Sequence, residues 1–200
     1  MSNNKQYHRR SIRLQGYDYT QNGAYFVTIC AHERRHLFGN VVDGNMRVND
    51  WGVFVRSCWD EIPAHHPYIE LDAFVVMPNH MHGVIVIAGD NGVMIDTTGD
   101  DRRGMIDTTG DDRRGMIYHA PTDIKREFSK PIAHSLSSIV GTFKAAVTRH
   151  IKRQPNAPDH PIWQRNYYEH IIRSEESLNT IRSYVATNPT KWVEDSLHNP

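Results

Sequence analysis

Two histidines separated by one residue, His80 and His82, form the motif in this sequence best suited to chemistry. On a β-strand both imidazoles would project from the same face, where they could share one metal ion. The chain holds 13 histidines, so a pair at this spacing is weak evidence by itself. Apolar residues flank the pair, however, and imidazoles buried among them would need polar partners. The pair is therefore a candidate metal site.

A second candidate pair lies near the C-terminus, where Tyr184 and Asn188 are four residues apart in a segment of helical periodicity. Residues at this spacing share one face of a helix, so the phenol and the amide carbonyl would point the same way. Each residue also has an ordinary explanation. Tyr184 is in register with apolar Leu178 and Ile181, as a core residue would be, and Asn188 precedes Pro189 at an expected helix end. Only the combination with the histidine pair suggests chemistry.

The apolar periodicity predicts the elements that position these residues. Strands are expected at 24–31, 71–77 and 81–88, an extended segment at 162–172, and a small hairpin around Asp43-Gly44 at 41–46. Helices are expected from Asn49 or Asp50 to the residue before Pro63, over 136–151, and from Ser174 to Asn188. The order strand, helix, strand, strand, helix, strand, helix indicates an α+β protein with a ferredoxin-like split βαβ antiparallel sheet, helices on it and an additional C-terminal helix. The 71–88 hairpin is expected at the centre of the sheet.

A chain of 200 residues and 23.1 kDa is expected to form a single domain, 1–200. It carries a tandem repeat, since MIDTTGDDRRG at 94–104 recurs unchanged at 105–115. The repeat is rich in turn-forming residues and almost without apolar ones, so 89–131 is interpreted as a flexible surface insertion. Cys30 and Cys58 have no metal or disulfide spacing, and no apolar run is long enough to cross a bilayer. A cytoplasmic protein is therefore expected.

The net charge is zero, with 23 basic and 23 acidic residues, which argues against a protein that holds nucleic acid by bulk charge alone. The basic residues are nevertheless concentrated in 1–35 and 140–173, and such patches can contact phosphates. Ordinary solvated faces are the alternative explanation. The candidate DNA-binding residues are Arg10, Arg13, Lys144, Arg149, Lys152 and Arg165.

Three motifs follow one another along the chain: MPNHMHGVIVI at 77–87, IWQRNYYEHIIR at 162–173 and IRSYVATNPTKW at 181–192. Together, and in this order, they resemble the REP-associated tyrosine transposases, a branch of the single-tyrosine HUH transposases. The resemblance covers about 10–88 and 132–193. It implies that the C-terminal helix bears the nucleophile, Tyr184, and that His80, His82 and Asn188 bind a divalent metal, Mg²⁺ or Mn²⁺. It also implies a nucleoid-associated monomer or homodimer acting on single-stranded DNA, with palindromic hairpins as the expected partner.

The function that the resemblance implies is metal-dependent cleavage and strand transfer of single-stranded DNA through a 5′-phosphotyrosine intermediate, as in DNA transposition. One alternative is a catalytically inactive nucleic-acid-binding module derived from such a transposase. Another is a metallohydrolase without a covalent intermediate, which the absence of an obvious acidic ligand near the histidine pair disfavours. Tyr167 and Tyr168, adjacent on the expected 162–172 segment, are rival nucleophiles.

Overall fold

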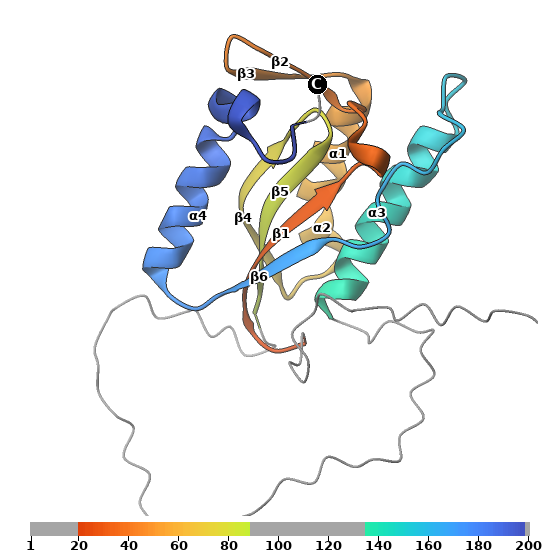
Figure 1. Cartoon of the computed structure of the whole chain (residues 1–200). Helices are drawn as coiled ribbons and strands as arrows, with labels where there is room; N and C mark the ends of the chain where they lie inside the picture. The colour runs from red at the N-terminus through yellow and green to blue at the C-terminus, as the bar shows by residue number, and fades with distance from the viewer. Residues whose placement is uncertain (1–19, 89–134, 199–200) are drawn as a thin grey trace, which may run out of the picture.

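The computed structural model describes residues 20–88 and 135–198, which form one four-stranded sheet with helices on both faces (Figure 1). The insertion expected at 89–131, with its repeat, lies outside the described residues, as do Arg10 and Arg13.

The sheet has the order β4-β5-β1-β6, and every neighbouring pair is antiparallel. The strands are β1 (Gly23–Cys30), β4 (Ile69–Val76), β5 (His80–Ile87) and β6 (Tyr168–Ile172). Strand β5 is inserted between β1 and β4, which is the split βαβ arrangement, and the expected α+β fold class is confirmed. The central position expected for the 71–88 hairpin holds for β5 but is wrong for β4, which lies at the edge. Of the extended segment expected at 162–172, only the second half joins the sheet.

Two helices of the sheet's first face follow the sequence pattern closely. Helix α1 (Asp50–Asp60) begins where the Asn49 side chain accepts a hydrogen bond from the backbone N–H of Gly52, and Ser135 caps α3 (Leu136–Lys152) in the same way. The sequence predicted that the helix would continue to the residue before Pro63, but α1 ends earlier, at Asp60. Pro63 lies in the first turn of a separate short helix, α2 (Ile62–His65), where its missing N–H leaves no hydrogen bond unmade.

A small two-stranded ribbon, β2 (Gly39–Val42) and β3 (Asn45–Val48), is the hairpin expected around Asp43-Gly44. Both turn residues have positive φ, 50° and 72°, as a tight hairpin turn requires.

Helix α4 (Glu175–Thr187), capped by Ser174, covers the second face of the sheet (Figure 1). The helix ends at Asn188, as expected, but Asn188 keeps helical dihedral angles and the chain continues as a 3₁₀ turn over Pro189–Glu194. The preference of a residue before proline for extended backbone is overridden by packing, because Trp192 is buried against the rings of His36 and His80. This turn redirects the C-terminal segment toward the sheet.

Candidate active site

Strand β5 supplies the histidine pair, and its alternation sends both imidazoles to the face covered by α4. His80 is fully buried and His82 is 2% exposed. Their Nε2 atoms are 3.0 Å apart. Two imidazoles therefore converge edge to edge in the interior, as the sequence spacing predicts.

The other ring nitrogen of each histidine has its own partner. His80 Nδ1 lies 2.7 Å from Oδ1 of Asn79, whose amide nitrogen donates to the carbonyls of Arg34 and Leu197. Because an amide oxygen only accepts, His80 carries its proton on Nδ1 and presents a lone pair at Nε2. His82 Nδ1 lies 2.8 Å from the Thr28 hydroxyl on the neighbouring strand. Such outer partners orient imidazoles toward a metal.

Burial lowers the pKa of both imidazoles to about 3, with the Arg34 charge adding to the effect at His80 and the other imidazole adding to it at His82. Both rings are therefore uncharged at neutral pH. Neutral imidazoles are the form that ligates metal ions.

Helix α4 brings Tyr184 to the same place. The Tyr184 hydroxyl lies 3.2 Å from His82 Nε2, while 43% of the residue is exposed. The Phe26 ring packs against both, with its centroid 5.3 Å from that of His82 and 6.1 Å from that of Tyr184. Partial burial raises the pKa of the Tyr184 phenol, the Asp195 charge raises it further, and the nearby Asn188 amide lowers it. The phenol is thus protonated at neutral pH and reachable from solvent.

Asn188 lies one helical turn beyond Tyr184 and is 2% exposed. Its amide nitrogen donates to Asp195 Oδ2 at 3.1 Å. Its Oδ1 atom is buried and makes no hydrogen bond within the described residues. A buried oxygen without a donor is costly, so this atom is suited to a cation or a water at the site.

Asp195 is the site residue that the sequence reasoning missed. Its side chain is 4% exposed, and its Oδ2 lies 3.8 Å from His80 Nε2. Each of His80, His82 and Asp195 offers a ligand atom within 4.8 Å of the others. The sequence shows no obvious acidic ligand beside the histidine pair, and the fold supplies one from near the C-terminus. No local motif marks Asp195, because the 3₁₀ turn that delivers it depends on the tertiary packing of Trp192.

These donors fit a divalent cation. Two ligands at right angles, each about 2.1 Å from an octahedral ion, are about 3.0 Å apart, which is the separation of the two Nε2 atoms. The carboxylate of Asp195 would balance part of the ion's charge, and the amide oxygen of Asn188 lacks another donor. Imidazole and oxygen donors, with an edge open through Tyr184, form a site for an accessible divalent cation rather than a closed structural metal site.

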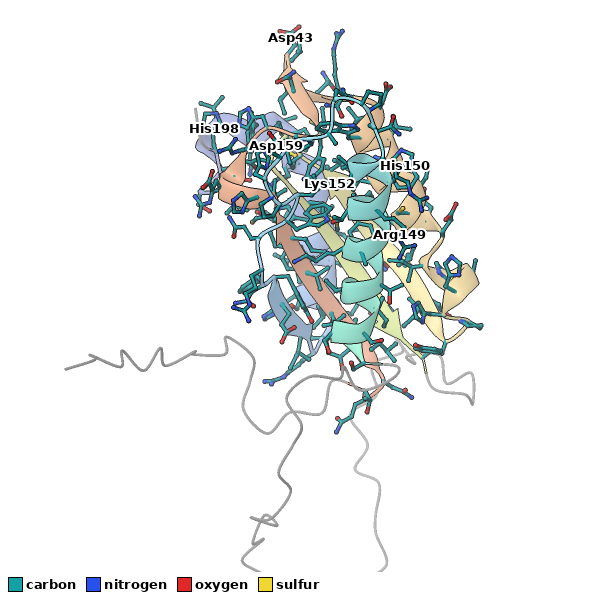
Figure 2. The ribbon with its side chains drawn as sticks, turned by 90° about the vertical axis from the view of Figure 1, so that its right-hand side faces the viewer. Asp43, Arg149, His150, Lys152, Asp159 and His198 are labelled. Carbon is teal, nitrogen blue, oxygen red and sulfur yellow. The ribbon has the colours of Figure 1, made fainter. Side chains whose placement is uncertain are left out.

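The structure does not bring the candidate DNA-binding residues of α3 to this site. Helix α3 covers the opposite face of the sheet, and Figure 2 shows Arg149 and Lys152 on its outer side. The amine of Lys152 donates to the backbone carbonyls of Pro158 and His160. The amine of Lys144 donates to the Gln164 carbonyl at 2.6 Å, and burial lowers its pKa to about 8. Both lysines thus bind the loop that follows α3.

Of the other candidates, Arg165 lies exposed in that loop. Tyr167 packs against the core on the α1 and α3 face, whereas Tyr168 faces the α4 side, with its ring 6.5 Å from that of Phe26. Tyr168 is thus near the site, but the hydroxyl that contacts the imidazole pair belongs to Tyr184.

The chain is similar in sequence to two proteins of Haemophilus influenzae. A scan against models of known protein families finds no match. The chain is 37% identical over 192 residues to an uncharacterized protein of Haemophilus influenzae, covering 96% of this chain and 94% of that one. It is 22% identical over 190 residues to a protein of the same organism described as a putative REP-associated tyrosine transposase, covering 90% and 83% of the two chains.

A solved structure of a REP-associated tyrosine transposase bound to a REP hairpin has a similar fold, with a TM-score of 0.52 and 19% identity over 90% of this chain and 74% of that one. Within the described ranges, no helix has the length and apolar character needed to span a bilayer. The chain therefore belongs to one family with the uncharacterized Haemophilus influenzae protein, and its resemblance to the REP-associated tyrosine transposases is confirmed.

Proposed function

We propose that this protein is a metal-dependent enzyme that cleaves single-stranded DNA and transfers the strand through a covalent 5′-phosphotyrosine on Tyr184. The observation that carries the proposal is the 3.2 Å contact between the Tyr184 hydroxyl and Nε2 of His82, one of the two buried imidazoles. A phenol held by a long helix against two buried, neutral imidazoles is not explained by packing, because 43% of Tyr184 remains exposed.

His80, His82 and either Asn188 or Asp195 would hold the divalent cation, Mg²⁺ or Mn²⁺. When bound, the cation would offset the negative charge of the scissile phosphate and of the attacking oxygen. The metal-free site lacks that compensation. Burial and the Asp195 charge both disfavour a Tyr184 phenolate, and the two neutral imidazoles supply no positive charge.

The chain's own residues would perform the remaining steps. The Tyr184 oxygen attacks phosphorus, the bond from phosphorus to the 3′ oxygen breaks, and that oxygen leaves as a 3′-hydroxyl after taking up a proton. The phenol proton can pass to water, since the hydroxyl is partly exposed. The phosphodiester bond energy is kept in the phosphotyrosine, so a second 3′-hydroxyl can reverse the attack without ATP.

The proposed substrate is single-stranded DNA beside a palindromic hairpin, as the REP hairpin bound to the solved neighbour suggests. Because α4 delivers Tyr184 to the imidazole pair of its own chain, we propose a site complete in one monomer. We also propose that DNA contacts Arg10, Arg13, Arg149 and Arg165. The protein is proposed to act at the nucleoid.

The test is a covalent-adduct assay with the full chain, Mn²⁺ or Mg²⁺, and labelled hairpin DNA with single-stranded flanks. Wild type should form an adduct that survives denaturing electrophoresis, and Tyr184→Phe should form none. Tyr168→Phe is the matched control and should retain the adduct. An adduct that persists in Tyr184→Phe would overturn the assignment. Binding without cleavage in either metal would favour an inactive DNA-binding module.

A metallohydrolase without a covalent intermediate is the second candidate, because Asp195 completes a set of two histidines and a carboxylate. It predicts cleavage that Tyr184→Phe leaves intact, together with products free of protein. The same gel therefore separates the two functions.

A further inference from the structure

We infer that the open groove between β6 and the N-terminal half of α4 binds a nucleobase of the DNA strand next to the scissile phosphate, with Tyr168 as the stacking platform. This inference rests on the proposed function and names a subsite for its substrate. Tyr168 would be a binding residue, distinct from the nucleophile.

The groove has a volume of about 490 Å³ and opens to solvent beside the candidate active site. Phe26, Tyr168 and Ile181 form its apolar part, and Ser174, Ser177 and Thr180 of the α4 side contribute hydroxyls. The Thr180 hydroxyl donates to the Glu176 carbonyl, so it can only accept from a ligand. A volume of this size accommodates a planar heterocycle with its sugar. The groove is also bounded by β6, an edge strand, so a linear polymer can enter and leave along it.

The groove and the active site share one wall, the Phe26 ring. The centroid of this ring lies 6.1 Å from that of Tyr184 and 6.5 Å from that of Tyr168, with an edge-to-face arrangement in each pair. Two successive ring contacts thus connect the candidate nucleophile to the groove. A strand whose phosphate lies at Tyr184 would place a neighbouring nucleotide here.

The exposure of Tyr168 points to a ligand. Among the phenylalanine, tyrosine and tryptophan side chains in 20–88 and 135–198, only Tyr168 and Tyr184 are exposed, at 55% and 43%. Both contact the same Phe26 ring. Exposed aromatic side chains are the usual platforms for unpaired bases, because every base has a π face that stacks on them.

The polar lining favours a base over a phosphate. The described residues that line the groove include no lysine or arginine, and Glu176 contributes a carboxylate that would repel a phosphate. Hydroxyls and a carboxylate are instead good partners for the amino and ring nitrogen groups on the edge of a base. Stacking on Tyr168 with hydrogen bonds from α4 is therefore the arrangement that the lining supports.

The test uses the full chain with Tyr184→Phe, which should bind DNA without cleaving it, and hairpin DNA carrying 2-aminopurine at successive positions of its single-stranded flank. We expect the fluorescence of 2-aminopurine to be quenched strongly at one position near the cleavage site. Tyr168→Ala should abolish that quenching and weaken binding by roughly 5- to 150-fold, the range for loss of one stacked base. Tyr168→Phe, which keeps the ring, should retain both.

An abasic nucleotide at the quenched position provides the second arm. It should weaken binding to the Tyr184→Phe protein by a similar factor and have little effect when Tyr168 is also alanine. Affinity and quenching that are unchanged by Tyr168→Ala would overturn the inference, even if wild type forms the Tyr184 adduct. Quenching that depends on Tyr168 in a protein whose Tyr184 forms no adduct would instead support the groove and refute the proposed function.

Discussion

The two faces of the sheet divide stability and chemistry between them. The face under α1 and α3 is an extended apolar core, to which β5 contributes Met81 and Ile85. The face under α4 has only a small apolar cluster, and there the same strand contributes His80 and His82. Alternation along one strand thus allows consecutive residues to serve opposite purposes. A buried polar site can be kept in a small domain because the opposite face supplies most of the apolar burial.

The largest effect on stability is expected from Trp59→Ala on the α1 and α3 face. Trp59 is 1% exposed, and its ring stacks on that of Phe74 with the centroids 4.8 Å apart. It also fills the space next to Gly83, where an added Cβ atom would lie 2.3 Å from the Trp59 ring. Truncation should lower the free energy of unfolding by about 3–5 kcal/mol. Urea unfolding followed by circular dichroism measures the loss.

The matched control on the other face is Tyr184→Phe, which removes one partly exposed hydroxyl and should change the free energy of unfolding by less than about 1 kcal/mol. If Trp59→Ala lowered the free energy of unfolding no more than Tyr184→Phe does, the division between the two faces would be refuted.

The sequence predicted the parts of this division that depend on local periodicity. Alternation placed His80 and His82 on one face, and helical spacing placed Tyr184 and Asn188 together, before any fold was known. The β-branched and helical patterns also gave the order of elements and hence the fold class. Each of these inferences needs only the geometry of a single strand or helix.

The rest depends on contacts between distant segments. Asp195 reaches the imidazoles only because the 3₁₀ turn after α4 is packed through Trp192, and no local pattern contains that information. Lys144 and Lys152 follow a basic helical pattern, yet their amines bind loop carbonyls, because the path of the loop after α3 brings the carbonyls to them. Charge patterns show which residues are polar, but not what they contact.

The next largest effect is expected on the α4 face, where the removal of an imidazole should weaken metal binding. His80→Ala removes one of the two converging imidazoles and should weaken Mn²⁺ binding by about a hundredfold or more, since loss of an outer partner alone commonly costs 10- to 100-fold. Titration of Mn²⁺ monitored by electron paramagnetic resonance measures the free ion. His65→Ala, an exposed histidine at the end of α2, is the control and should bind as wild type does. Equal affinity in the two variants would exclude the histidine pair as the metal site.

A smaller change is expected from Asp195→Asn, which tests whether the missed carboxylate contributes to the metal site. Loss of its charge should reduce Mn²⁺ affinity by roughly tenfold, because the imidazoles and Asn188 remain. Glu194→Gln makes the same charge change one residue earlier, on an exposed side chain, and should leave affinity unaltered. Asp195→Asn with full affinity would restrict Asp195 to its hydrogen bond with Asn188.

The smallest effect concerns how α4 is held over the site. Strand β4 has an irregularity between Leu71 and Phe74, and Asp72 there accepts two hydrogen bonds from the Arg182 guanidinium, at 2.8 and 2.6 Å. A bulge at a sheet edge commonly redirects a side chain, and here it aims a carboxylate at the helix that carries Tyr184. The pair therefore anchors α4 two residues before the candidate nucleophile.

The hydrogen bonds from Arg182 hold the pKa of Asp72 below its usual value. A carboxyl whose pKa is lowered by folding adds stability above its unfolded-state pKa, and that stability is lost as the pH falls through the lower, folded-state pKa.

Because the Asp72–Arg182 pair is partly exposed, Asp72→Asn should lower the free energy of unfolding by only about 0.5 kcal/mol at neutral pH. The difference between wild type and variant should shrink toward zero in acid, as urea unfolding between about pH 7 and about pH 3 would show. Glu70→Gln, on the same strand and exposed, is the control and should leave the free energy of unfolding at neutral pH unchanged. A cost of Asp72→Asn that is the same at every pH would mean that α4 is held by shape and apolar contact rather than by this ion pair.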